Sequence, residues 1–233
     1  MISNPFSTLK KREWTLWIIS LLIVGISNIL AGSVLPSTLL GTLIGVTALI
    51  FLAKGNVWGQ ILTVVFSILY AITSYEFKYY GEMITYLGMT MPIAIMSIVT
   101  WIKNPYEKGK DEVKIHYLTK KQKIMMVVLS FIVTWIFYYI LKILDTPNLF
   151  FSTISITTSF LASYLMLYRN SYYAIAYSLN DIVLIVLWIL ASIENITYLP
   201  MIMCFLMFFV NDIYGFISWK KREKKQSKSA KKE

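Results

Sequence analysis

The chain has 233 residues, of which 57% are apolar and 15% charged. Soluble domains are about half apolar and about a quarter charged, so this composition excludes an ordinary soluble enzyme, a disordered chain and a disulfide-rich scaffold. One cysteine and one histidine leave no material for an intrachain disulfide or a histidine-based metal site, and neither a metal nor a cofactor is expected. The net charge of +10 admits nucleic acid as a partner until the placement of the basic residues is known.

Eight apolar runs follow one another along the chain. Each is long enough to cross a hydrocarbon core of about 30 Å as a helix. A helix is expected because lipid offers no partners to backbone N–H and C=O groups. The first run lacks the short apolar core and small-residue cleavage site of a signal peptide, so we interpret it as a retained helix. The runs are residues 14–31, 35–53, 58–75, 82–102, 123–142, 147–167, 172–192 and 198–219.

The basic residues predict the orientation of these helices. Eight crossings place both termini on one side, and all Lys and Arg residues except Lys78 and Lys142 then fall on that side. The positive-inside rule makes it the cytoplasmic side. The tail 220–233 is basic and polar, so we expect it to be disordered and to touch anionic lipid. This placement explains the net charge, and nucleic acid is not expected as a partner.

Two stretches of the chain, 52–103 and 167–221, form an internal repeat. Each contains a basic turn, an outward helix, a short loop and an inward helix. The residues that pair are Asn56 with Asn170, Trp58 with Tyr172, and Trp101 with Trp219. Adding the preceding helix to each stretch gives two three-helix units of the same orientation, which is a parallel repeat of the kind found in transporters.

The sequence therefore predicts an all-α integral membrane protein with eight transmembrane helices. One N-terminal helix precedes two parallel three-helix bundles, which a linker helix joins. The expected segments are 1–34 with the first helix, 35–103 as the first bundle, 104–122 as a cytoplasmic loop, 123–146 as the linker helix, 147–219 as the second bundle and 220–233 as the basic tail.

Two Asn-Asp pairs stand out inside the predicted helices, at Asn180-Asp181 and Asn211-Asp212. An ionised Asp at the middle of the bilayer costs about 2.5–3.5 kcal/mol on insertion scales, and such residues usually face a bundle interior or a substrate pathway. Hydrogen bonding between helices is the alternative explanation. The pairs lie on consecutive antiparallel helices and can converge at one depth, which favours the pathway.

Aromatic and amide side chains accompany these pairs. Tyr173, Tyr177 and Trp188 share one helical face with Asn180, and Trp58, Gln60 and Tyr70 supply similar groups in the first repeat. Flat aromatic walls with a few amides and carboxylates suit a small heteroaromatic ligand with hydroxyls, and a positive charge on it would be favoured. Anchoring at the membrane interface is the other explanation for such aromatics. Glu82, near the start of a helix, complements the helix dipole or forms part of an outer gate.

The stretches GNVWGQILTVVFSILY and YAIAYSLNDIVLIVLW resemble the two halves of PnuC-type nicotinamide riboside (vitamin B3) transporters, and the resemblance covers residues 35–222. It implies a SWEET-like arrangement of three helices, a linker and three helices. It also implies a bacterial plasma-membrane facilitator, possible homotrimers, and trapping of the substrate by cytoplasmic phosphorylation to nicotinamide mononucleotide. Family members often carry a tryptophan pair where this chain has Tyr172-Tyr173. Thiamine, riboflavin and deoxynucleosides therefore stay open as substrates.

The hypothesis is facilitated uptake of nicotinamide riboside at a midplane site between the bundles. Aromatic residues would wall the ring, amides would bind hydroxyl or amide groups, and the two Asp residues would orient these partners or attract a cationic ring. The predicted site residues are Trp58, Gln60, Tyr70, Tyr173, Tyr177, Asn180, Asp181, Trp188, Asn211 and Asp212. The alternatives are a proton-coupled transporter, a membrane enzyme that holds Mg²⁺ at a lipid or prenyl phosphate, and a non-transporting adaptor.

Overall fold

A computed structural model of the chain describes residues 4–31, 35–107 and 112–229, and the long elements in these ranges are helices. Within them, eight helical segments are long and apolar enough to cross a membrane, which confirms the predicted spans. One span consists of α4, a π-helix (η2) and α5. The elements are α1 (Lys11–Leu30), α2 (Pro36–Ala53), α3 (Val57–Glu76), α4 (Tyr80–Thr85), η2 (Tyr86–Thr90), α5 (Met91–Lys103), α6 (Lys120–Ile143), α7 (Leu149–Leu167), α8 (Tyr173–Glu194) and α9 (Leu199–Ser229), with short 3₁₀ turns η1 (Pro5–Thr8) and η3 (Ile196–Tyr198).

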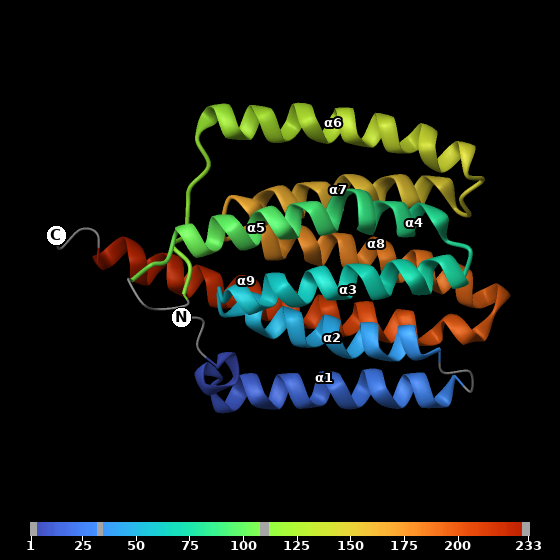
Figure 1. Cartoon of the computed structure of the whole chain (residues 1–233), viewed down its shortest axis with the longest axis horizontal. Coiled ribbons are helices and arrows are strands. Elements are labelled where there is room, and N and C mark those ends of the chain that lie inside the picture. Colours follow the sequence, from blue (N-terminus) through green and yellow to red (C-terminus); the bar gives the residue numbers. More distant parts are fainter. Residues whose placement is uncertain (1–3, 32–34, 108–111, 230–233) are drawn as a thin grey trace.

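The helices lie roughly side by side, with α1 and α6 at opposite flanks (Figure 1). Between these flanks, α2 packs against α3 and α9, and α8 packs against α7 and α9. Helix α1 begins and α9 ends at the same end of the molecule (Figure 1). We call it the basic end, because Lys54, Lys103 and Arg169 lie at or just after helix ends there, and the lysines and arginines of the last part of α9 lie there as well. The division of these helices into two three-helix bundles stays a prediction.

The turns at the start of the two repeated stretches have the same construction. Gly55 after α2 and Arg169 after α7 both adopt left-handed backbone angles, with φ of 66° and 55°. The next residue in each turn bonds to the backbone two residues on: the Asn56 side chain, at the N-cap of α3, accepts from the Trp58 N–H at 2.9 Å, and the Asn170 side chain, just before α8, accepts from the Tyr172 N–H at 3.1 Å. The predicted pairing of Asn56 with Asn170 is therefore confirmed in structure.

Each repeat also reaches into the turn of the other. The Trp219 indole N–H donates to the Leu52 carbonyl at 2.8 Å, and the Trp101 indole N–H donates to the Met166 carbonyl at 3.2 Å. The two indole rings meet with their centroids 5.6 Å apart. The residue before each tryptophan makes an equivalent hydrogen bond to the other repeat. The Ser218 hydroxyl donates to the Ala53 carbonyl, and the Thr100 hydroxyl donates to the Leu167 carbonyl. These reciprocal bonds confirm the predicted pairing of Trp101 with Trp219 and hold the basic end of the two repeats together.

The loop before α6 contacts both repeated turns. The Val113 N–H donates to the Gly55 carbonyl and the His116 N–H donates to the Arg169 carbonyl, each at 3.1 Å. Two donors three residues apart thus satisfy the exposed carbonyls of two equivalent turns. The loop between the repeats is part of their interface at the basic end.

The fourth span contains a π-helix at Tyr86–Thr90, immediately before Met91 and Pro92. Proline lacks an N–H and its ring crowds the carbonyl four residues earlier, which disturbs regular α-helical bonding. A π-turn accommodates the disturbance without ending the span, and such turns are frequent at functional sites. Tyr86 and Thr90 belong to this turn and are buried.

The expectation of a disordered tail was wrong as far as Ser229, because α9 continues through these residues. Long straight side chains there favour a helix, and the tail also has partners. Gln226 accepts from the Ile115 N–H and donates to the Val113 carbonyl, while Arg222 pairs with Glu112. Residues 230–233 of the predicted tail lie outside the described residues.

Candidate functional site

A small cavity lies at the centre of the molecule, enclosed by α2, α3, η2, α7, α8 and α9. Its volume of about 40 Å³ holds only a few water molecules. A nucleoside therefore requires the helices to move apart before it fits. The lining residues are Gly45, Ala48, Leu49, Leu52, Thr63, Phe66, Tyr86, Thr90, Met166, Tyr177, Asn180, Asp181, Phe205, Phe208 and Asp212.

The two aspartates meet at this cavity. Asp181 comes from α8 and Asp212 from α9, both are nearly fully buried, and their carboxyl groups lie close enough to interact. The Oδ2 atom of Asp181 has no hydrogen-bond partner among the described residues. The expected convergence of the Asn-Asp pairs thus holds for the carboxyl groups. An unpartnered carboxyl oxygen in an apolar interior is costly, so the arrangement favours a ligand that brings donor groups, and a positively charged ligand would stabilise the ionised form.

Helix α7 holds the polar side chains of α8 in position. The Thr158 hydroxyl donates to the Asn180 Oδ1 at 2.8 Å, and the Ser163 and Tyr177 hydroxyls are hydrogen-bonded at 2.8 Å. The Asn180 Nδ2 makes no hydrogen bond to the described residues, so its two donors are available to a ligand. The serines and threonines of α7 therefore orient the site residues on the neighbouring helix.

Phenylalanines that the sequence analysis missed supply much of the cavity wall. Phe66 of α3 stacks on Tyr70 at 5.5 Å between centroids and contacts Phe208 at 5.3 Å. Phe205 and Phe208 precede Asp212 by seven and four residues, so they share its helical face. That spacing is the signal that predicts them once Asp212 is assigned to the cavity.

Tyr70 and Trp188 form an aromatic layer between the cavity and the end opposite the basic end. The Trp188 indole N–H donates to the Tyr70 hydroxyl at 3.2 Å. Trp188 also packs against Tyr79, at the N-cap of α4, and against Tyr198 of η3, both at that end. Neither Tyr70 nor Trp188 lines the cavity. The ring of Tyr70 does pack against the ring of Tyr86, which lines the cavity, with 4.2 Å between their centroids. The role of Tyr70 and Trp188 in binding stays a prediction.

Three other predicted residues lie towards the basic end. Tyr173 is buried, packs on Trp219 at 4.8 Å and has a hydroxyl without a partner among the described residues. Trp58 and Gln60, in the first turn of α3, likewise carry buried nitrogens without partners within the described ranges. Gln60 precedes the lining residue Thr63 by three positions. None of the three borders the cavity, and their assignment as binding residues stays a prediction.

Asn211 faces α1 in the structure. Its amide donates to the Ser20 hydroxyl at 3.0 Å and to the Met207 carbonyl at 2.7 Å. Consecutive residues of an α-helix point about 100° apart, so Asn211 and its neighbour Asp212 contact different surroundings. Asn211 takes part in helix–helix hydrogen bonding, and a role in ligand binding stays a prediction.

Glu82 lies near the start of a helix, as the sequence predicts, and its side chain is buried near the aromatic layer. It lies in the first turn of α4, and its Oε1 accepts from the Ser155 hydroxyl of α7 at 3.2 Å. The pattern of the sequence contains no signal for this contact, because Glu82 and Ser155 are 73 residues apart.

Comparisons with known proteins agree with this geometry. The sequence profile described as nicotinamide mononucleotide transporter matches residues 35–221. A nicotinamide riboside transporter PnuC from Neisseria mucosa is 28% identical over 187 residues, which cover 78% of this chain and 71% of the relative. A crystal structure of the vitamin B3 transporter PnuC matches with a TM-score of 0.81 at 25% identity, and the match covers 94% of each chain. Helix α1 lies before the residues that the profile matches.

Proposed function

The chain belongs to the nicotinamide mononucleotide transporter family, and from this premise we propose that its substrate is nicotinamide riboside, carried across a bacterial plasma membrane. The family and both relatives are named as transporters, so the chain is a multi-pass membrane transporter rather than a membrane enzyme or an adaptor. The relative from Neisseria mucosa is named for nicotinamide riboside, which supports the choice of substrate.

The observation that carries the proposal is the pair of buried carboxyl groups beside an aromatic wall. Nicotinamide riboside has a cationic pyridinium ring, a carboxamide and ribose hydroxyls. Asp181 and Asp212 favour the positive ring, and the phenylalanines and Tyr86 of the cavity can pack on its faces. Asn180 supplies free donors for the carboxamide oxygen or a ribose hydroxyl.

The same carboxyl groups would make nicotinamide mononucleotide a poorer ligand than nicotinamide riboside. A phosphate ester adds about two negative charges, which Asp181 and Asp212 would repel in a low-dielectric interior. Phosphorylation after entry would therefore trap the nucleoside on the side where it occurs. The positive-inside rule supports a cytoplasmic basic end, so both termini would share the compartment in which the substrate is phosphorylated.

Calorimetric binding to the purified transporter tests the substrate. We expect nicotinamide riboside to bind at least about tenfold more tightly than nicotinamide mononucleotide. Thiamine, riboflavin and deoxynucleosides belong in the same series, because tighter binding of one of them would move the protein to a related vitamin. Equal affinity for the riboside and the mononucleotide would contradict the proposal.

A charge-removing variant tests the mechanism. Asp181→Asn keeps the side-chain shape and is expected to weaken binding of cationic nicotinamide riboside about tenfold, while binding of its uncharged reduced form changes by less than about twofold. The control is Asp145→Asn, which removes a carboxylate from an exposed turn and leaves both affinities unchanged. An equal loss for both ligands would show that charge recognition is not the role of Asp181.

A further inference from the structure

A second, larger cavity lies at the basic end, separate from the central one. Its volume is about 820 Å³, and it is bordered by the start of α1, the turn after α2, the segment around Glu112 and the extension of α9. We call it the basic pocket, because seven lysines and arginines line it. They are Lys10, Lys11 and Arg12 at the start of α1, Lys54 after α2, and Lys221, Arg222 and Lys225 of α9.

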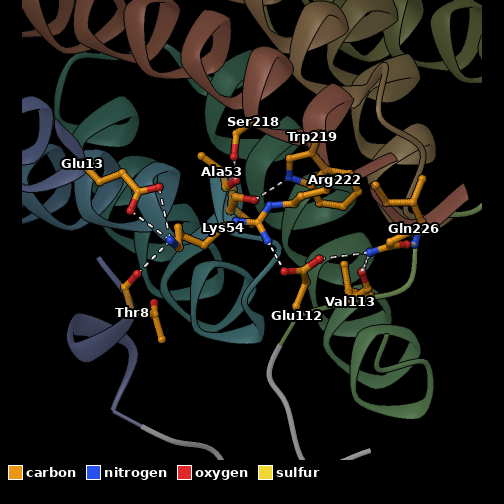
Figure 2. Close-up of polar contacts among 12 residues, drawn as sticks. Thr8, Glu13, Ala53, Lys54, Glu112, Val113, Ser218, Trp219, Arg222 and Gln226 are labelled. Atoms are coloured by element: carbon orange, nitrogen blue, oxygen red, sulfur yellow. Dashed lines mark hydrogen bonds and ion pairs between the residues drawn. The ribbon is translucent and has the colours of Figure 1, made fainter. Parts of the chain in front are cut away.

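The two carboxylates of the basic pocket already have partners (Figure 2). Glu13 pairs with Lys54 at 2.9 Å and accepts from the Tyr214 hydroxyl at 2.8 Å. Glu112 pairs with Arg222 and accepts from the Gln226 amide. Within the described part of the chain, the five other cations of the pocket form no ion pair. The excess of positive charge is therefore a property of the pocket itself.

Arg222 also provides one N–H donor that has no hydrogen-bond partner among the described residues. One of its guanidinium nitrogens pairs with Glu112, but its Nε is buried and has no partner among the described residues. A planar guanidinium with a free N–H suits an oxygen-rich anion such as phosphate. Mutual repulsion among the clustered cations falls when such an anion binds between them.

The position of the basic pocket relative to the membrane surface indicates the source of the anion. Phe6, Trp14 and Trp17 form an aromatic cluster at the start of α1, with centroids 5.3 to 6.0 Å apart. Trp and Tyr at such helix ends lie at the level of lipid headgroups. Helix α1 is at a flank of the molecule (Figure 1), a position that would be open to lipid in a membrane. The start of α1 also lies outside the region that the family profile matches.

We propose that the basic pocket binds a phosphate group, supplied by the headgroup of an anionic lipid in the leaflet at the basic end. The cations of α1 and α9 would hold the phosphate from two sides, with the Arg222 Nε as a direct donor. A soluble phosphate shares this chemistry, so the test has one arm for each source.

The test compares two triple variants that remove the same charge. The pocket variant is Lys11→Gln, Lys221→Gln and Lys225→Gln, none of which breaks an ion pair of the described structure. The control variant is Lys103→Gln, Lys120→Gln and Lys123→Gln, which lie at the basic end but do not line the pocket. Nicotinamide riboside binding at the central cavity should be unchanged in both variants, which reports that they are folded.

The lipid arm uses native mass spectrometry with dioctanoylphosphatidylglycerol and dioctanoylphosphatidylcholine. The soluble arm measures the shift in Tm caused by sodium phosphate relative to sodium chloride at equal ionic strength. We expect the wild type and the control variant to prefer phosphatidylglycerol, and the pocket variant to bind it at least about tenfold more weakly.

A loss confined to the sodium phosphate arm would keep the phosphate site and assign it to a soluble ligand. If the pocket variant matches the control variant in both arms, the proposal is overturned. Lys11→Gln alone serves as a second variant if the triple variant does not fold. It is expected to lower phosphatidylglycerol binding in the same direction by a smaller factor, and an unchanged affinity would again contradict the site.

Discussion

A single hydrogen bond determines which atoms Asn180 offers to a ligand. Thr158 donates to its Oδ1, which leaves the two Nδ2 donors without partners among the described residues. The donors lie beside the carboxyl groups of Asp181 and Asp212, which can only accept when ionised. The site therefore combines donors and acceptors on neighbouring side chains, as a ligand with both hydroxyl and amide groups requires.

Removing this amide should impair binding without unfolding the protein. Asn180→Ala is expected to lower the affinity for nicotinamide riboside about tenfold, because a ligand acceptor would be left buried without a donor. The Thr158 hydroxyl could then donate to the Ile154 or the Ser155 carbonyl in place of Asn180. Uptake into proteoliposomes at matched protein amounts measures the effect. The control is Asn28→Ala, a buried amide that bonds within α1 and to Thr42 of α2. Unchanged uptake by Asn180→Ala would remove this residue from the site.

At the scale of helices, the close approach of α2 and α3 depends on a glycine. A Cβ atom at Gly59 would lie 2.6 Å from the backbone nitrogen of Leu52, on the other side of the turn. The backbone of Leu52 cannot move aside as a flexible side chain can, so α2 and α3 would have to separate. The carbonyl of Leu52 is also the acceptor for Trp219, which links this local packing to the contact between the repeats.

Gly59→Ala is therefore expected to destabilise the transporter by about 1–3 kcal/mol, as overpacking does elsewhere. Gly25→Ala in α1 is the matched control, since a Cβ there meets nothing within 4 Å. Thermal denaturation in one detergent compares the two variants. A Tm for Gly59→Ala equal to that of Gly25→Ala would show that α2 and α3 can adjust without cost.

The sequence could predict which segments are helices, but only in part which way they face. Span lengths and the repeated Asn turns predict the elements, because both depend on local chemistry. Which side chains of a helix point into the interior depends on how the helices pack against one another. Asp181 and Asp212 converge as expected, whereas Asn211 contacts α1 and the phenylalanine wall was missed. The contact of Glu82 with Ser155 and the helical tail bound to the loop before α6 join distant segments, which periodicity cannot report.

At the scale of the whole molecule, the reciprocal tryptophan contacts close the basic end of the central cavity. Trp101 and Trp219 each bond to the opposite repeat, and Tyr173 packs on Trp219 between them and the cavity. If access alternates between the two ends, opening towards the basic end would break these bonds, and opening the other way would separate Tyr70 from Trp188. Alternating access would then be an exchange between two states. The tryptophan contacts are broken in one state, and the contact between Tyr70 and Trp188 is broken in the other.

Weakening the closure at the basic end should shift the population towards the open form. The double variant Trp101→Phe and Trp219→Phe removes two indole donors, each worth about 1 kcal/mol, so the open population is expected to rise about tenfold or more. The exchange rates of the Val113 and His116 backbone N–H groups with deuterium report opening on this side, because both groups bond to the turns at the basic end. Trp135→Phe on the exposed face of α6 is the control. Equal exchange rates in the double variant, the control and the wild type would contradict this assignment.

The acceptors of the reciprocal contacts have a consequence for how the two halves of the chain can evolve. Four side chains donate to main-chain carbonyls of the opposite half, namely those of Thr100, Trp101, Ser218 and Trp219. The N–H groups of Val113 and His116 in the loop also donate to main-chain carbonyls. Every amino acid provides a carbonyl, so substitutions on the accepting side leave the contact intact. The accepting residues of either half could therefore be substituted without loss of these contacts, as long as the four donor side chains are kept.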